Sequence, residues 1–103
     1  MSRYRLTQLA SDDLREIVAY LAEQAGEDIA LRIEDQLFAK FASLAARPGQ
    51  GHRRSDLTYL PLLFFTVDPY LIVYQRDISP IVIHAIFHGA RDVKRHLKAR
   101  TIE

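Results

Sequence analysis

Apolar residues recur at helical spacing in two stretches of the first half of the chain. The first apolar stripe consists of Ala10, Leu14, Ile17, Val18 and Leu21. The second stripe consists of Ile29, Ile33, Leu37, Phe41 and Leu44. Gly26 is expected to end the first helix and Pro48-Gly49 the second. Because the link between them is short, the two helices are predicted to form an antiparallel hairpin, each with an apolar face that needs cover.

Runs of β-branched and aromatic residues replace this spacing in the second half of the chain. Strands are predicted at 62–67, 70–75 and 81–87, because turn residues separate these runs. The connections are too short for crossovers, so the three strands are expected to form an antiparallel meander. A short opening strand is expected at 4–6, and a last helix from Asp92 to about Arg100.

Polar residues indicate where the helices begin. Thr7 or Ser11 can cap the first helix, and Asp28 can cap the second. In the last helix, Val93 and Leu97 are expected to point inward. The predicted fold class is therefore α+β: an N-terminal antiparallel helical hairpin packed on a mainly antiparallel β-sheet, with a short C-terminal helix. All 103 residues are expected to form a single domain.

Composition is that of an ordinary soluble globular protein. Hydrophobic residues make up 49% of the chain and charged residues 26%. The longest apolar run, 59–67, is too short to span a bilayer, so no membrane partner is expected. The tyrosines and phenylalanines are assigned to the core. The absence of cysteine excludes disulfides and thiolate metal sites and fits a reducing cytoplasm, which is the expected location.

Charge is distributed unevenly along the chain, although the net charge is only +1. Between residues 11 and 36 there are eight acids and two arginines, whereas 91–100 contains five bases and one acid. Arg47, Arg53 and Arg54 form a second basic group in the middle. We therefore expect acidic helices together with a basic loop and a basic tail.

A polar segment, His88-Gly89-Ala90-Arg91-Asp92, follows the last predicted strand. Glycine lets the backbone turn out of a strand and Asp92 suits a helix cap, so these two residues have a structural interpretation. His88 and Arg91 are the better functional candidates, because loops held by a rigid scaffold often carry function.

Short strings of residues are spaced in a characteristic order from about Arg3 to Leu97. They are Tyr4-Arg5-Leu6-Thr7, Ala10, Asp13-Leu14, Leu44-Ala45, Pro48, Gly51, Arg54-Ser55-Asp56-Leu57, Tyr70-Leu71-Ile72-Val73-Tyr74 and His88-Gly89-Ala90-Arg91-Asp92. In this order and spacing the chain resembles the RelE/ParE superfamily of type II toxin–antitoxin toxins, and most closely its ParE branch.

The resemblance implies a small cytoplasmic bacterial toxin that a co-expressed, ParD-like antitoxin holds inactive. ParE-like toxins act on DNA gyrase, whereas relatives in the RelE branch cut mRNA on the ribosome. The family also suggests an assembly of two toxin and two antitoxin chains. The C-terminal part of the antitoxin is expected to wrap the toxin, with its acids meeting the basic loop and tail.

The candidates for binding the target or the antitoxin are basic side chains in loops, at strand ends and in the last helix. They are Arg53, Arg54, Arg76, His88, Arg91 and Arg95. Guanidinium groups suit carboxylates and phosphates, so the arginines would form one positive patch if they converged. The plainer interpretation is a solvated surface, with the bases of 94–100 stabilising the dipole of the last helix.

A metal site formed by His84 and His88 fails on geometry. In a strand the two imidazoles share a face but are roughly 13 Å apart, at about 3.3 Å per residue. Zinc bonds imidazole nitrogen at about 2 Å, so one ion cannot bridge them. Since the chain also has no phosphate-binding glycine loop and no serine-nucleophile elbow, neither a metal nor a cofactor is expected.

Two functions of different classes remain. A ParE-like inhibitor would capture gyrase through a surface and would do no chemistry. A RelE-like, ribosome-dependent endoribonuclease would need a base, an acid and cations. Arg53, Arg54 and Arg76 could supply the cations and His88 a proton, but a persuasive base is missing. The low net charge also departs from the basic character of RNA-cutting relatives, so a gyrase inhibitor that is not an enzyme is favoured.

Overall fold

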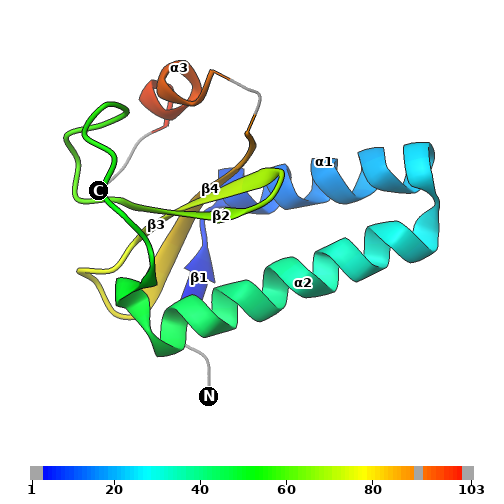
Figure 1. The fold of residues 1–103 in the computed structure, drawn as a ribbon, viewed down its shortest axis with the longest axis horizontal. Coiled ribbons are helices and arrows are strands. Elements are labelled where there is room, and N and C mark those ends of the chain that lie inside the picture. Colours follow the sequence, from blue (N-terminus) through cyan, green and yellow to red (C-terminus); the bar gives the residue numbers. More distant parts are fainter. Residues whose placement is uncertain (1–3, 90–91, 101–103) are drawn as a thin grey trace.

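The computed structural model describes residues 4–89 and 92–100. A four-stranded sheet lies between a helical hairpin and a short last helix (Figure 1). The elements are β1 (Tyr4–Leu6), α1 (Gln8–Ala25), α2 (Glu27–Ala46), the 3₁₀ turn η1 (Pro48–Gln50), β2 (Leu63–Val67), β3 (Tyr70–Gln75), β4 (Ile81–His88) and α3 (Val93–Lys98). The predicted α+β fold is therefore confirmed.

The sheet is mixed, with strand order β1-β4-β3-β2. β2, β3 and β4 form the predicted antiparallel meander. The opening strand β1 joins β4 in a parallel pair, in which Leu6 lies opposite Ile83. β2 and β1 are thus the two edges, and β4 is an inner strand only as far as the short β1 covers it.

The hairpin begins and turns largely as the sequence predicts. The hydroxyl of Thr7 caps α1 by accepting a hydrogen bond from the backbone N–H of Ala10 at 3.1 Å. Gly26 ends α1 with φ at +99°, which favours glycine. The same glycine precedes α2 directly, so Asp28 lies in the first turn of α2 and is not its cap. No helix within the described ranges is long and apolar enough to cross a membrane.

The hairpin covers one face of the sheet with most of its predicted apolar stripes. Leu37, Phe41 and Leu44 are fully buried against that face. Ile29, which belongs to the same predicted stripe, is 37% exposed, and the neighbouring Ala30 is buried in its place. Ile29 lies near the tip of the hairpin, which projects beyond the sheet (Figure 1), so no strand is available to cover it.

The second face of the sheet is covered by α3 and by the loop that precedes β2. Its core contains Leu62, Phe64, Val73, Ala85, Phe87, Val93 and Leu97. Val93 and Leu97 are buried, as expected, and Asp92 caps α3 by accepting a hydrogen bond from the backbone N–H of Arg95 at 3.2 Å. Burial on both faces explains why β3 and β4 are apolar along nearly their whole length.

A β-bulge in β4 changes the direction of its side chains. Val73 lies opposite Ala85 and Tyr74 lies opposite Ile83, so His84 is an extra residue in the ladder. His84 consequently points to the α3 side of the sheet, where its Nε2 lies 2.9 Å from Oε1 of Gln75. After the bulge, the alternation of the β4 side chains between the two faces of the sheet is shifted by one residue relative to a regular strand.

Candidate functional site

The sequence-predicted site residues fall into separate regions of the molecule. His88 ends β4, whereas Arg76 directly follows β3. Arg53 and Arg54 are exposed in the loop before β2, and Arg95 is exposed on α3. The remaining candidate, Arg91, lies outside the described residues.

His88 and Arg76 stand at opposite ends of the same pair of strands. His88 lies opposite Tyr70, while Gln75, the residue before Arg76, lies opposite Val82. Tyr70 and Gln75 are five positions apart in β3, which corresponds to about 17 Å at 3.3 Å per residue, and Arg76 lies one position farther. The endoribonuclease alternative, which needs His88 and Arg76 around one phosphate, is therefore not supported by the register of these strands.

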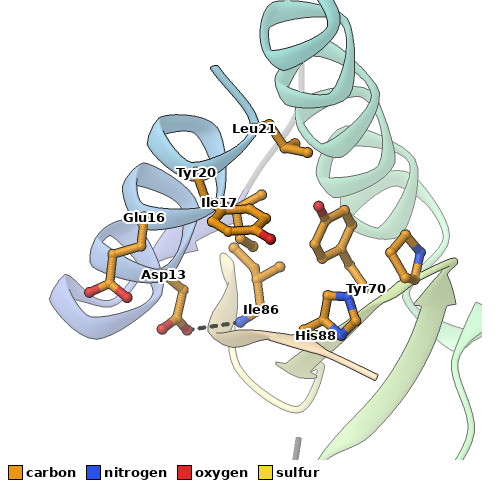
Figure 2. A pocket seen from close by; sticks show the side chains of 9 residues that line it. Asp13, Glu16, Ile17, Tyr20, Leu21, Tyr70, Ile86 and His88 are labelled. Atoms are coloured by element: carbon orange, nitrogen blue, oxygen red, sulfur yellow. Dashed lines mark hydrogen bonds between the residues drawn. The ribbon is translucent and has the colours of Figure 1, made fainter. Parts of the chain in front are cut away.

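His88 borders the hollow that we call the α1–β4 cavity (Figure 2). The cavity has a volume of about 330 Å³ and lies between α1 and the ends of β3 and β4. Its lining consists of Asp13, Glu16, Ile17, Tyr20, Leu21, Pro69, Tyr70, Ile86 and His88. The imidazole of His88 packs edge-on against the ring of Tyr70, with 5.9 Å between ring centroids.

The walls of the α1–β4 cavity suit an apolar side chain better than a reacting group. Burial raises the pKa of the Tyr70 phenol, and the nearby Tyr20 raises it further, so Tyr70 stays neutral at physiological pH. The carboxylate of Asp13 is already engaged in hydrogen bonds, and Glu16 is exposed at the rim.

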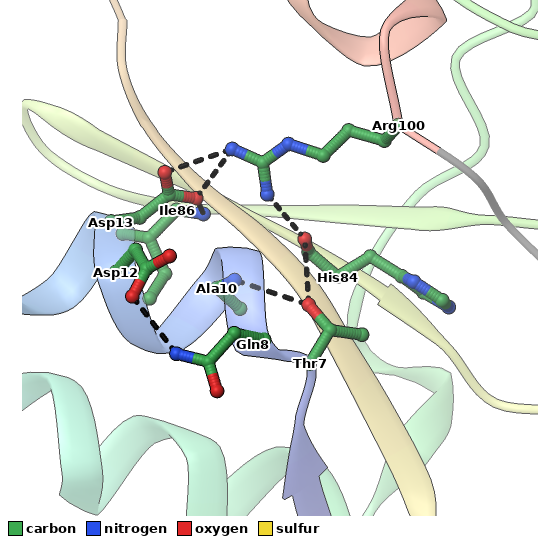
Figure 3. A network of polar contacts seen from close by, with 8 residues as sticks. All are labelled: Thr7, Gln8, Ala10, Asp12, Asp13, His84, Ile86 and Arg100. Atoms are coloured by element: carbon green, nitrogen blue, oxygen red, sulfur yellow. Dashed lines mark hydrogen bonds and ion pairs between the residues drawn. The ribbon is translucent and has the colours of Figure 1, made fainter.

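Asp13 is held by the C-terminal segment in a network of polar contacts (Figure 3). Nη2 of Arg100 donates to Oδ1 of Asp13 at 2.8 Å and to Oδ2 at 2.9 Å. Nη1 of Arg100 donates to the carbonyl oxygen of His84 at 2.7 Å. Oδ2 of Asp13 also accepts the backbone N–H of Ile86 at 3.0 Å. The guanidinium lies over the ring of Phe87, 5.2 Å from its centroid.

This network replaces the strand that β4 lacks at its exposed edge. β1 ends at Leu6, and the backbone N–H of Thr7 makes the next hydrogen bond, to the carbonyl of Ile83 at 3.1 Å. Farther along β4, Asp13 and Arg100 satisfy the backbone groups of Ile86 and His84. Buried backbone groups need such partners, so the network is a structural feature of the fold.

Arg76 lies against the η1 turn at the other end of the sheet. Its Nη1 would be 3.2 Å from a Cβ built on Gly49. Nearby, the hydroxyl of Tyr74 donates to the carbonyl of Pro48 at 2.6 Å and accepts the backbone N–H of Gly51 at 2.9 Å. Burial raises the pKa of Tyr74 although Gly51 and Arg76 act in the opposite direction. Tyr74 is therefore a neutral hydrogen-bonding group that fixes the turn.

Arg53 and Arg54 belong to the loop that leads to α3. Arg53 follows His52, whose backbone pairs with Phe64 of the edge strand β2 through hydrogen bonds of 2.9 and 2.8 Å. The guanidinium of Arg54 binds both carboxylate oxygens of Asp56, at 2.9 and 2.8 Å. Arg54, with a smaller contribution from Lys94 on α3, lowers the pKa of Asp56. Part of the basic loop thus faces α3.

A groove of about 440 Å³ lies between this loop and α3. We call it the α3 groove. It is lined by Ser55, Asp56, Leu57, Thr58, Tyr59, Leu60, Lys94 and Lys98. A second hollow on the same helix is lined by Asp92, Lys94, Arg95, Lys98 and Ala99. Lys94 and Lys98 therefore border both hollows, and the second contains the predicted site residue Arg95.

Sequence reasoning missed the exposed tyrosines. Tyr59 is 93% exposed and Tyr20 is 65% exposed, so their assignment to the core is wrong. For Tyr59 a signal was available, because Pro61 interrupts the apolar run after it and the true strand begins only at Leu63. The contact between Asp13 and Arg100 was also missed, since nothing local in the sequence links residues so far apart.

The histidines are arranged differently from the expected shared face. The bulge places His84 on the α3 side of the sheet with Gln75, whereas His88 packs on Tyr70 on the hairpin side. Within the described residues, no group of three or more histidine, aspartate or glutamate side chains could hold a metal ion.

Comparisons with known proteins identify a matching family and a solved structure with a similar fold. The family described as "ParE toxin of type II toxin-antitoxin system, parDE" matches residues 4–93. A solved structure described as "Chromosomal ParDE TA system from P. aeruginosa" is similar with a TM-score of 0.70 and 21% sequence identity, covering 85% of this chain and 96% of that one. At this identity the likeness shows the fold. A search of curated proteins gives no significant match.

Proposed function

The chain belongs to the ParE toxin family of type II toxin–antitoxin systems, and from this premise we propose that it inhibits DNA gyrase by binding it and is neutralised by a cognate antitoxin. The family match over residues 4–93 carries the proposal. In this proposal the chain acts in the cytoplasm as a single toxin domain. Two toxin and two antitoxin chains form the neutralised assembly.

The distance between His88 and Arg76 supports an inhibitor that binds its target over an RNA-cutting enzyme. Cleavage of RNA through the ribose 2′-OH needs an acid, a base and cations around one phosphate. His88 and Arg76 are separated along the sheet by more than about 17 Å, by the strand rise, so they cannot serve one phosphate. Asp13, a carboxylate that lines the same cavity as His88, is already bound by Arg100 and by the N–H of Ile86. A binding surface needs no such convergence.

The charge distribution supports an acidic antitoxin. Arg53 and Arg54 in the loop and Lys94, Arg95 and Lys98 on α3 are exposed, and among these only Arg54 forms a described ion pair. Antitoxin segments that fold on binding combine apolar anchors with complementary charge. In the proposal, the acids of the antitoxin meet this basic side of the toxin, and the acidic hairpin remains on the far side of the sheet.

Two assays with purified protein test the proposed target. In a gyrase assay, the chain should block supercoiling or trap cleaved DNA, and added antitoxin should restore supercoiling. In a translation extract, the chain should leave the mRNA uncut. Codon-placed mRNA cuts that are lost in both His88→Ala and Arg76→Ala, together with unaffected gyrase, would replace the proposal with a ribosome-dependent endoribonuclease. Arg32→Ala, at an exposed position on α2, is the control variant in both assays.

A further inference from the structure

The α3 groove combines exposed apolar side chains with exposed positive charge. Tyr59 is 93% exposed and Leu60 is 43% exposed on one wall. On the facing wall, Lys94 and Lys98 are four residues apart on α3 and therefore lie on the same side of the helix. The one acid in the groove, Asp56, is bound by Arg54. The groove thus offers apolar surface beside two cations.

The loop wall of the groove is fixed before any partner arrives. The backbone N–H groups of Leu57 and Thr58 both donate to the carbonyl of Arg54, at 2.9 and 3.1 Å. The hydroxyl of Thr58 accepts the N–H of Leu60 at 3.1 Å. Leu57 packs against the core beneath α3. A preformed wall lowers the ordering cost of binding, because little of the loop has to be immobilised.

Tyr59 is placed as an anchor residue of an interface. Burying a large aromatic side chain stabilises a protein, and Tyr59 forgoes nearly all of that gain by facing solvent. Tyrosine is enriched among the residues that dominate binding energy. Its side chain provides a large contact area, and binding has to fix only two side-chain torsions. Its neighbour Leu60 extends the apolar surface.

We propose that the α3 groove binds a segment of the cognate antitoxin that carries an apolar side chain flanked by acids. The apolar side chain packs beside Tyr59 and Leu60, and the acids pair with Lys94 and Lys98. The charge of the groove selects this occupant, because a basic segment would meet two ammonium groups and no unpaired described carboxylate. The inference rests on the proposed neutralisation by an antitoxin and adds the place of contact.

Photo-crosslinking tests the place of contact directly. The photoreactive residue p-benzoylphenylalanine is introduced at Tyr59 in one full-length variant and at Tyr20 in another, since both are exposed tyrosines on different sides of the sheet. Each is mixed with the purified antitoxin encoded beside the toxin, and with purified gyrase in parallel. We expect position 59 to crosslink to an acidic, apolar segment of the antitoxin, located by mass spectrometry.

Charge reversal tests the role of the two lysines. Lys94→Glu with Lys98→Glu should weaken antitoxin binding about tenfold or more, because two exposed ion pairs are lost and replaced by repulsion. The matched control, Arg15→Glu with Arg32→Glu, makes the same change of charge at exposed positions on the hairpin and should weaken binding less than about threefold. Thermal unfolding of each variant shows whether the fold is retained.

The outcomes separate this inference from the proposal beneath it. If the unmodified chain does not bind the antitoxin, the proposed neutralisation fails and the groove assignment fails with it. Tight antitoxin binding with crosslinks only from position 20, or equal weakening by both charge-reversed pairs, overturns the groove assignment alone. Crosslinks from position 59 to gyrase and not to the antitoxin also overturn it, because the groove would then serve the target.

Discussion

Arg100 forms an ion pair with Asp13, 87 residues earlier in the chain, and joins the C-terminal segment to the first helix. The two side chains are 13% and 11% exposed, so the pair is largely removed from water. Through Arg100 and Asp13 the bare part of β4 obtains hydrogen-bond partners for His84 and Ile86. One contact between distant segments thus completes the edge of the sheet.

Replacing Arg100 should destabilise the fold strongly. Arg100→Ala leaves the carboxylate of Asp13 poorly solvated and the carbonyl of His84 without its strongest partner, which should lower the free energy of unfolding by about 3 kcal/mol. The control is Arg15→Ala, because the pair of Arg15 with Asp12 is exposed (71% and 36%) and should be worth about 0.5 kcal/mol. Urea unfolding measures both. Equal losses in the two variants would contradict a structural role for the Arg100 pair.

Two glycines of the η1 region should respond differently to a methyl group. A Cβ at Gly51 would lie 2.8 Å from the hydroxyl oxygen of Tyr74 and 3.0 Å from the carbonyl oxygen of Phe64, so Gly51→Ala should cost about 2 kcal/mol of stability. A Cβ at Gly49 would meet only the end of the exposed Arg76 side chain, which can move, so Gly49→Ala should cost well under 1 kcal/mol. Thermal unfolding of the two variants makes the comparison. A harmless Gly51→Ala would show that the Tyr74 contact is not tight.

The stability of the chain should fall as pH decreases below the ordinary pKa of histidine. Burial first, and then the charges of Arg5 and Arg100, lower the pKa of His84 in the folded state. Between the folded pKa and the unfolded value of about 6.5, the unfolded chain binds more protons. The contribution of His84 is therefore fully present above about pH 6.5 and is lost as pH falls toward its folded pKa.

Unfolding free energies measured from pH 7.5 to 5 should show this slope. His84→Gln keeps a polar side chain that can meet Gln75 but does not titrate, so it should flatten the slope in that window. His52→Gln, which replaces an exposed histidine outside the sheet core, is the control. An identical slope in all three proteins would assign the pH dependence to other groups.

Salt should weaken the proposed complex with the antitoxin. If acids of the antitoxin meet the basic loop and α3, raising the salt from about 0.05 to about 0.5 M shortens the range of their attraction and should weaken binding at least about fivefold. Isothermal titration calorimetry at the two salt concentrations measures the change. A complex that is equally tight at both would rule out the electrostatic contribution and leave the apolar contacts to account for affinity.

The sequence determined the elements of this protein because their signals are local. Helical spacing, a cap at Thr7 or Ser11 and the stop at Gly26 predicted the hairpin, and turn residues predicted the meander. Each signal lies within a few residues, where backbone preferences and side-chain periodicity act. The order and spacing of short strings then indicated the toxin family that residues 4–93 match.

Only the tertiary structure decided how side chains from distant segments meet. The bulge at His84 shifts the alternation of β4 by one residue, which local periodicity does not reveal. The register of β3 and β4 was needed to show that His88 and Arg76 lie at opposite ends of these strands. The packing of the C-terminal segment was needed to show that Arg100 contacts Asp13. Such contacts depend on strand pairing and on the docking of segments that are far apart in the chain, and no short stretch of sequence encodes either one.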